Sequence, residues 1–282
     1  MHATSSVGST LRDGRARAAY ALKVGRVFAE HPHEALDRAR DVLADRKERR
    51  RRPFRYEATS DWHRPLHDLF SLPWPCDAVA EFDHIWSTLV RELSARSLSP
   101  GRATYGGWDD AGPALALAAY CLTRHLRPER AVETGVAHGV TTRFVLEALE
   151  RNGGGGALWS IDLPPLVASD LQHELALAVP EDLRDRWTLC LGSSRQQLPG
   201  LVEQLGSIDL FIHDSLHTER NLRCELDHAW GALRPGGAVI VDDVDYNLGL
   251  RAFVEQVPGT SHLVAEHDDR QRLFGVIRKE PG

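Results

Sequence analysis

Residues 130–139, Arg-Ala-Val-Glu-Thr-Gly-Val-Ala-His-Gly, decide the fold of this chain. The stretch begins as a short apolar strand, and Gly135 and Gly139 then bracket a tight turn into a helical pattern over residues 141–151. Glycines in such a turn can adopt positive φ angles and let the backbone approach a ligand closely. Ligands of open α/β sheets bind at the carboxyl edge, where the strand order reverses. The stretch therefore predicts the first strand and the ligand-binding turn of an α/β domain.

The sequence that follows repeats the alternation of strand and helix. We expect strands at residues 158–162, 187–191, 208–213 and 238–242, and helices at 112–126, 194–205, 218–233 and 248–257, with helical turns up to 185. Strands that are almost purely apolar indicate a parallel sheet covered on both faces. The last two strands, 261–266 and 272–278, are too close in sequence for a crossover helix, so they must pair antiparallel. The predicted fold is a doubly wound, mostly parallel, seven-stranded α/β sheet with an antiparallel last strand.

The pattern changes before residue 100. Apolar stripes at helical spacing cover residues 35–43 and 79–93, whereas residues 53–76 are rich in Pro, His and Trp and are expected to be irregular. We therefore expect residues 1–100 to form a helical N-terminal extension that acts as a lid or a dimerisation surface. Residues 101–282 then form the α/β domain, in which residues 105–110 are either a hinge and lid or a packed linker.

Composition limits the class of protein. Of the 282 residues, 42% are hydrophobic and 26% are charged, as is ordinary for a globular chain. The sequence opens without an apolar signal segment, and its longest apolar stretch, near residues 114–122, is too short to span a bilayer. We expect a cytoplasmic protein with no membrane partner. The four cysteines, scattered without a CxxC pair, are expected to be free thiols rather than disulfides or a zinc knuckle; they are Cys76, Cys121, Cys190 and Cys224.

Charge is distributed unevenly along the chain. The net charge is −6, but residues 1–60 hold 14 Lys and Arg against 8 Asp and Glu, which makes that segment +6. The densest basic run, residues 46–55, is either the solvated end of a helix or a contact for RNA, an acidic partner or an anionic surface. Because the chain as a whole is acidic, we do not expect nucleic acid as a partner.

Acidic and small residues at successive strand ends indicate what the turn binds. The GxxxG spacing of Gly135 and Gly139 differs from the dinucleotide pattern GxGxxG. Glu133 would repel a pyrophosphate, but it suits a ligand that carries an ammonium and a sulfonium group. Asp162, at the end of the second strand, can accept hydrogen bonds from both hydroxyls of a ribose. Ser193 follows the third strand, where it would meet an adenine ring.

These residues together resemble class I S-adenosylmethionine-dependent methyltransferases over roughly residues 105–280. The matching segments are Glu133-x-Gly135-x-x-x-Gly139, Asp162, Gly192-Ser193 and Leu233-Arg234-Pro235-Gly236-Gly237, with Ala137 in place of the family's usual third glycine. The resemblance implies that Glu133, Gly135 and the following turn hold the methionine part of S-adenosylmethionine, that Asp162 binds its ribose and that Ser193 lies near its adenine. The expected cofactor-binding residues are Glu133, Gly135, Gly139, Thr141, Asp162, Ser193 and Asp214.

Three more carboxylates are expected at the same edge of the sheet. Asp214 ends the fourth strand, and Asp242 and Asp243 end the fifth. Three carboxylates in one cleft repel each other unless they are protonated or compensated by a cation, and oxygen ligands favour Mg²⁺ over Zn²⁺. We expect Asp214, Asp242 and Asp243 to bind a divalent metal. The alternative is that Asp242 and Asp243 accept hydrogen bonds from backbone amides of the next loop.

The run from His213 to Thr218, with the Asp242-Asp243 pair, is most similar to the bacterial sugar- and antibiotic-tailoring O-methyltransferases. We expect transfer of a methyl group to a hydroxyl of a small metabolite, with His217 and Asp214 as the catalytic residues. His217 is three residues after Asp214 and can take the acceptor's proton; the alternative is that it only caps a helix or pairs with a carboxylate. His138 is expected to be structural.

Other functions stay open on the same fold. They are methylation of nitrogen or of a macromolecule, and a non-catalytic cofactor-binding partner; an NAD-dependent oxidoreductase is disfavoured by the glycine spacing. If the N-terminal extension is a dimerisation surface, the protein forms a homodimer.

Overall fold

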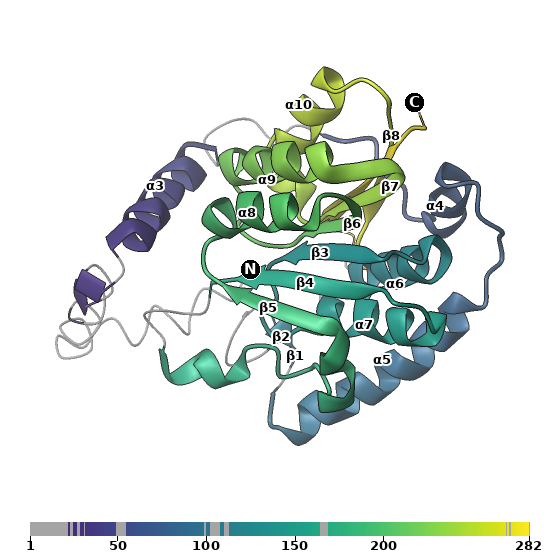
Figure 1. Cartoon of the computed structure of the whole chain (residues 1–282), viewed down its shortest axis with the longest axis horizontal. Coiled ribbons are helices and arrows are strands. Elements are labelled where there is room, and N and C mark those ends of the chain that lie inside the picture. Colours follow the sequence, from purple (N-terminus) through teal and green to yellow (C-terminus); the bar gives the residue numbers. More distant parts are fainter. Residues whose placement is uncertain are drawn as a thin grey trace.

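The computed structural model describes residues 32–48, 55–98, 113–163, 169–268, 270 and 272–281, together with short pieces at 22, 25–26, 29–30, 100–101 and 108–109. Figure 1 shows a central sheet with helices on both of its faces. The expected hinge at residues 105–110 lies mostly outside the described residues; only β2 (Trp108–Asp109) is seen, paired in parallel with β1 (Pro100–Gly101). Residues 49–54 of the basic run also lie outside the described residues.

The main sheet has seven strands in the order β5-β4-β3-β6-β7-β9-β8. The strands are β3 (Arg130–Thr134), β4 (Ala157–Asp162), β5 (Trp187–Leu191), β6 (Ile208–His213), β7 (Leu233–Val241), β8 (Thr260–Glu266) and β9 (Leu273–Lys279). Strands β3 to β7 pair in parallel, and β9 runs antiparallel to both β7 and β8. The predicted fold class is confirmed, including the antiparallel last strand.

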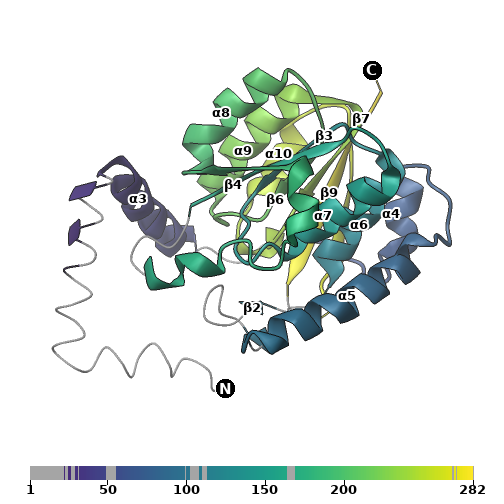
Figure 2. The ribbon, with the colours of Figure 1, turned by 60° about the horizontal axis from the view of Figure 1, so that its bottom comes forward.

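Two groups of helices cover the two faces of the sheet (Figure 2). On one face, α5 (Ala78–Ala95), α6 (Ala114–Leu126) and α7 (Val140–Asn152) pack on side chains such as Leu210 and Ile212 of β6. On the other, α8 (Ser194–Leu205), α9 (Glu219–Ala232) and α10 (Gly249–Gln256) pack on Phe211. Because successive strand residues point to opposite faces, purely apolar strands are needed to supply both cores.

The segment at residues 53–76 contains a helix that the sequence did not predict. Helix α4 (His63–Leu69) follows Trp62, and it buries Leu66 and His67. Its Pro65 lies in the first helical turn, where the missing N–H costs no hydrogen bond. The expectation of an irregular segment was therefore wrong for these residues, because proline in a first turn is compatible with a helix.

Residues 55–98 pack directly on the sheet. Thr59 forms a parallel bridge with Ala265 at the outer strand β8, and Trp62 contacts Phe274 of β9 edge to face. The buried residues of α4 and α5 belong to the same hydrophobic cluster as those of α6 and α7. The part of the chain before residue 100 thus shares its core with the sheet.

Helix α3 (Pro32–Glu48) reaches the carboxyl edge of the sheet. The Arg195 guanidinium binds the Asp41 carboxylate through two hydrogen bonds of 2.8 and 2.7 Å, and Glu48 accepts from the backbone N–H of Glu219 at 3.0 Å. These contacts fasten α3 to the first turns of α8 and α9. Within the described residues, no helix combines the length and apolar character that crossing a bilayer requires.

Candidate active site

The site lies where the strand order reverses, between β3 and β6. The two strands are neighbours in the sheet, and the backbone N–H of Asp214 donates to the carbonyl of Thr134 at 2.8 Å. The crossover from β3 leads to β4 on one side, while the chain after β6 continues to β7 on the other. A crevice at the carboxyl edge is expected at such a point. The loops after β3 and β6 therefore meet at one place.

Gly135 is required for this meeting of loops. Its φ angle is +87°, and a methyl group added there would lie 1.9 Å from the carbonyl oxygen of Asp214. Ala137 also has a positive φ, +47°, although it is not glycine. Gly139 starts α7 at φ +81°, and a methyl group there would meet Val179 at 2.8 Å. The turn is thus tightly packed on its neighbours, and the two glycines stand where side chains do not fit.

Asp162 holds the turn from the end of β4. Its Oδ2 accepts from the backbone N–H groups of Val136 at 3.1 Å and Ala137 at 2.8 Å, and its Oδ1 accepts from Leu163 at 2.6 Å. These three bonds use most of the roughly four acceptor positions of a carboxylate. The structure therefore gives Asp162 a role that the sequence did not reveal, which is to order the glycine turn.

Glu133 lies fully buried beneath the turn. Its Oε2 accepts from Thr142 and Ser160, both at 2.7 Å, while its Oε1 is buried without a hydrogen-bond partner within the described residues. Burial raises the pKa of Glu133 to about 7 against the lowering effect of these two donors. Thr141 is buried in the first turn of α7, and Ser193 is the residue before α8.

Three ionisable residues meet at the ends of β6 and β7. The pairing of His213 with Val241 places Asp214 beside Asp242, and each of Asp214, His217 and Asp242 offers a ligand atom within 4.8 Å of the others. Asp243 lies in the same place, since its Oδ2 is 3.7 Å from Nε2 of His217. The expected meeting of Asp214, Asp242 and Asp243 at one rim is found.

Electrostatic repulsion dominates this cluster. Burial, and then the charges of Asp242 and Asp243, raise the pKa of Asp214 well above its usual value. Burial and the charge of Asp242 likewise raise the pKa of Asp243 to about 7, and its Oδ1 is buried without a hydrogen-bond partner within the described residues. Such a group needs protons or a cation to become stable.

His217 lies beside these carboxylates, and its imidazole is neutral and harder to protonate than a free one. Burial lowers its pKa to about 4, so the imidazole is neutral at pH 7. Its Nε2 lies 3.8 Å from Asp214 Oδ1, which is too long for a direct hydrogen bond, and its Nδ1 is buried without a partner among the residues described. The imidazole therefore lies close to the carboxylates without forming a direct hydrogen bond to Asp214.

Two residues of the site were missed at the sequence level. The first is His267, which follows β8 and donates from Nε2 to Asp242 Oδ1 at 2.8 Å. Burial alone would raise the pKa of Asp242, but the hydrogen bond and charge of His267 lower it to about 2. Asp242 therefore pairs with a side chain, in contrast to the alternative of backbone amides. Only the pairing of β7 with β9, and of β9 with β8, brings His267 here.

The second missed residue is Glu225 of α9, which is fully buried below the rim. It accepts from the imidazole of His213 at 2.6 Å, from Ser215 at 2.7 Å and from Asn221 at 2.8 Å, and also from the hydroxyl of Thr134. Burial would raise its pKa, but the charge and hydrogen bond of His213 outweigh this and lower it to about 2. This network fixes the ends of β3 and β6 on which the rim is built.

His138 bonds to Glu174 rather than facing the rim. Its Nε2 lies 2.9 Å from Glu174 Oε2, and both side chains are buried. The backbone carbonyls of Ala137 and His138 accept from Ala176 and Ala178, each at 2.8 Å. These contacts tie the glycine turn to the segment after β4.

The domain that carries this rim matches a known family. Residues 132–244, which include the glycine turn, Asp162 and the carboxylate cluster, match a family model described as a methyltransferase domain. Over these residues, which are fewer than half of the chain, the sequence is similar to a methyltransferase domain. The expectation of an S-adenosylmethionine-dependent methyltransferase is thereby confirmed. The comparison with curated proteins gives no match.

Solved structures share the fold of this methyltransferase at low sequence identity. A candidate O-methyltransferase from Klebsiella pneumoniae is 20% identical with a TM-score of 0.51, over 78% of this chain and 98% of that one. An O-methyltransferase from Bacillus cereus, in complex with SAH, is 16% identical with a TM-score of 0.50, over 77% and 98%. The O-methyltransferase TomG from Streptomyces achromogenes, involved in tomaymycin synthesis and in complex with SAM, is 17% identical with a TM-score of 0.50, over 79% and 97%.

Proposed function

We propose that this methyltransferase transfers the methyl group of S-adenosylmethionine to a hydroxyl oxygen of a small metabolite. The observation that carries the proposal is the contact between Gly135 and Asp214, where a methyl group would lie 1.9 Å from the Asp214 carbonyl. It joins the glycine turn directly to the rim that holds the carboxylates and His217. The structural neighbours that were solved with SAM or SAH are O-methyltransferases, one of them in antibiotic synthesis, which supports this class of reaction.

The donor's binding site is proposed on the residues around the glycine turn. The turn has no side chain at Gly135, and the carboxylate of Asp162 lies beside it on the backbone N–H groups of the turn. Oε1 of Glu133 is buried without a hydrogen-bond partner within the described residues, and a ligand with two positive groups would stabilise the ionised form of this acid. We assign the methionine part of the donor to Glu133, Gly135, Gly139 and Thr141. Asp162 is assigned to the ribose and Ser193 to the adenine. Asp214 is assigned to the side of the donor that faces the rim.

We also propose that Asp214, Asp242 and Asp243 hold a divalent cation such as Mg²⁺. The three carboxylates fit a hard ion because they supply oxygen donors, although the imidazole of His217 lies within reach of the same place, and Asp243 Oδ1 has no other partner among the described residues. A bound cation lowers the pKa of a coordinated hydroxyl, which makes the acceptor oxygen more nucleophilic. His267 holds the Asp242 carboxylate in position through its hydrogen bond.

His217 is the residue that we propose as the base. A neutral imidazole can take the proton of the acceptor hydroxyl, and its Nδ1 is buried without a partner in the described part of the chain. The carboxylates of Asp214 and Asp243, 3.8 and 3.7 Å from its Nε2, stabilise the imidazolium that forms. The acceptor must then lie beside both His217 and the glycine turn, as an in-line displacement at the methyl carbon requires.

Binding of S-adenosylmethionine tests the first part of the proposal. Titration calorimetry should give saturable binding to the wild-type chain, and Asp162→Ala should weaken it by at least about tenfold because charge-assisted hydrogen bonds are lost. Asp182→Ala, at an exposed acid before β5, is the matched control and should bind as the wild type does. An unchanged affinity in Asp162→Ala would remove the assignment of this residue.

Metal binding is tested separately from turnover. Mg²⁺ or Mn²⁺ should bind the EDTA-treated chain once per molecule, and Asp242→Asn should abolish this binding while Asp227→Asn, at an exposed position of α9, leaves it intact. If EDTA-treated protein methylates hydroxylated acceptors at the full rate, an essential and loosely held metal is excluded.

The surroundings of the site complete the proposal. Because α3 is bonded to Arg195, two residues after Ser193, we propose that the N-terminal segment acts as a lid over the rim. A small-molecule acceptor, a homodimer through the same segment and a cytoplasmic location remain predictions. The bare rim of carboxylates disfavours nucleic acid as a substrate.

A further inference from the structure

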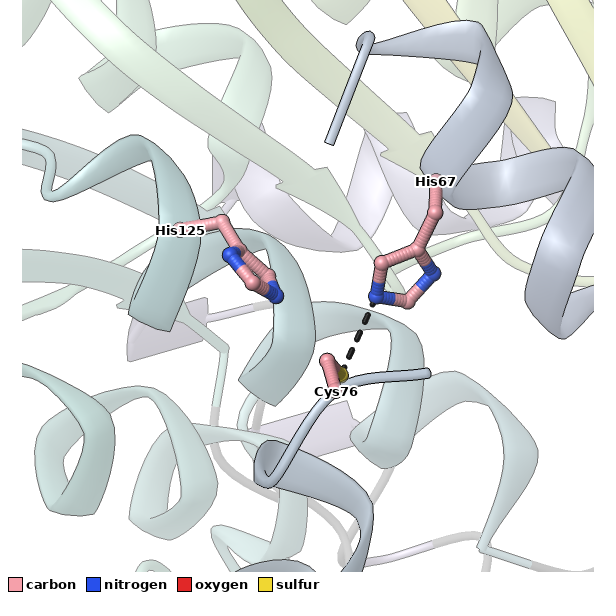
Figure 3. A group of neighbouring side chains, drawn as sticks. All are labelled: His67, Cys76 and His125. Atoms are coloured by element: carbon pink, nitrogen blue, oxygen red, sulfur yellow. Dashed lines mark hydrogen bonds between the residues drawn. The ribbon is translucent and has the colours of Figure 1, made fainter. Parts of the chain in front are cut away.

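A second cluster of metal-ligating side chains lies away from the active site. Figure 3 shows His67 from α4, Cys76 from the loop before α5 and His125 from α6, with the side chains converging from three segments. One ligand atom of each lies within 4.8 Å of the other two. His67 and Cys76 are nine residues apart, but His125 is distant in sequence from both, so no motif spacing reveals the cluster.

The hydrogen bonds of His67 leave its Nε2 free to be a ligand. Nδ1 of His67 donates to the backbone carbonyl of His63 at 2.7 Å, which places the proton on that nitrogen. Nε2 then faces Sγ of Cys76 at 3.1 Å with a lone pair. A carbonyl that fixes the histidine tautomer in this way is the usual outer partner of a metal-bound imidazole.

His125 supplies the second observation. Its Nε2 is buried and has no hydrogen-bond partner within the described residues. The ring stands edge to face with that of His67, with their centroids 5.3 Å apart. A buried imidazole nitrogen without a partner loses its hydrogen bond to water, and a metal bond would replace it.

Cys121 is a second thiol beside this group of three. It lies one helical turn before His125 on α6, is buried, and forms a hydrogen bond with Cys76. That bond, together with those from His125 and His67, lowers the pKa of Cys76 to about 4 although burial opposes the shift. The Cys76 thiol thus lies against imidazoles and a second thiol, where a metal ion would displace its proton.

We propose that His67, Cys76 and His125 form a structural zinc site that fastens α4 and the loop after it to α6, with the neighbouring thiol of Cys121 turning in as the fourth ligand. Sulfur and nitrogen donors favour Zn²⁺ over Mg²⁺, in contrast to the mainly carboxylate rim of the active site. Tetrahedral zinc with bonds of about 2.0–2.3 Å places its ligand atoms roughly 3.3–3.8 Å apart. The observed cluster needs only a small contraction to reach these separations.

The zinc site is at the opposite edge of the sheet from the methyltransferase rim. His125 is near the carboxyl end of α6, five residues before β3 begins at Arg130, so it lies by the amino end of that strand. The carboxylates lie beyond the carboxyl ends of β6 and β7. Occupancy of the two sites can therefore be measured independently.

The test is the metal content of the full chain. Protein purified without chelators should contain about one zinc per chain, and removal of zinc should lower the melting temperature, which equimolar Zn²⁺ then restores. In the Co²⁺-substituted protein, thiolate-to-metal charge transfer and the visible bands of a tetrahedral site should appear. Wild-type apo protein that fails to bind equimolar Zn²⁺ overturns the proposal, and this measurement does not depend on any variant folding.

Variants locate the ion. Cys76→Ser and His125→Asn should lower the zinc content at least about tenfold, because zinc affinity falls steeply when a ligand is lost. Cys224→Ser, a partly buried thiol on α9, and Asp242→Asn, in the active site, are the matched controls and should keep their zinc. Full zinc content in Cys76→Ser, loss of zinc in Asp242→Asn, or a Cys76–Cys121 disulfide in freshly purified unreduced protein would each sink the assignment.

Discussion

Two groups of buried acids lie next to each other at the carboxyl edge of the sheet, and they differ in how well they are hydrogen-bonded. Glu225, below the rim, accepts from His213, Ser215 and Asn221 and from the hydroxyl of Thr134. On the rim, Asp214 has its pKa raised by burial and by the neighbouring acids, and Asp243 Oδ1 is buried without a partner within the described residues.

The difference separates structure from function. A buried charge with a full set of donors holds the fold together, whereas buried charges that repel one another persist only if the site serves a ligand. The two groups should therefore respond with opposite signs when a carboxylate is replaced by its amide. We expect the changes in free energy to be largest at Glu225, smaller at Asp214 and smallest at His267.

The largest effect is expected for Glu225→Gln. The amide cannot carry the charge that His213 and the hydroxyl groups are arranged to receive, so a buried network loses its central partner. Breaking such a network costs about 3–5 kcal/mol of unfolding free energy. Urea unfolding measures the loss, with Asp227→Asn on the exposed face of the same helix as the control. A loss similar to that of the control would show that the network is not structural.

Acid should weaken the wild-type fold through the same residue. The pKa of Glu225 is about 2 in the folded state, below its usual value of 4.5, so its contribution is present above about pH 4.5 and disappears as the pH falls toward 2. By linkage a shift of this size corresponds to about 3 kcal/mol. Unfolding free energy measured from neutral pH downward should fall less steeply in Glu225→Gln than in the wild type. Equal slopes would contradict the assignment.

Sequence reasoning recovered the sheet because its signals are local. Apolar runs that end in Glu133, Asp162 or Asp214 define strands and their carboxyl ends at once, and the structure moves their bounds by only a few residues. The largest change is at β7, which begins at Leu233 rather than at residue 238. There the Pro-Gly-Gly segment reads as a turn, although pairing with β6 makes it part of the strand through a register shift.

The residues that the sequence missed act through tertiary contacts. Glu225 is one charged residue in a helix whose apolar stripe suggests packing alone, and nothing local indicates that His213 lies opposite it. His267 is in a short connection between two strands, and it meets Asp242 only once β9 is placed between β7 and β8. The ligands at His67 and His125 are likewise brought together by helix packing.

Asp214→Asn should have the opposite sign of effect on stability and should impair turnover. The neutral amide needs neither the proton nor the cation that the buried carboxyl group needs beside Asp242 and Asp243, so the unfolding free energy should rise by about 1 kcal/mol. The rim then loses a metal ligand, and methyl transfer to a hydroxylated acceptor should fall about a hundredfold, which is about 2.7 kcal/mol of barrier. A variant that is less stable than the wild type would show that Asp214 is a structural acid like Glu225.

The smallest effect is expected at His267, which connects the two kinds of acid because it satisfies Asp242 on the rim. His267→Leu removes the 2.8 Å hydrogen bond to Asp242 Oδ1 and leaves that carboxylate free to turn. Loss of a partner that orients a metal ligand lowers affinity or activity about tenfold, or roughly 1.4 kcal/mol. His267→Gln retains an N–H donor and should recover part of the loss. The decisive measurement is the affinity for Mg²⁺ in both variants: if His267→Leu binds the ion as tightly as the wild type, then Asp242 is oriented by the fold alone, and the hydrogen bond from His267 serves only to satisfy a buried charge.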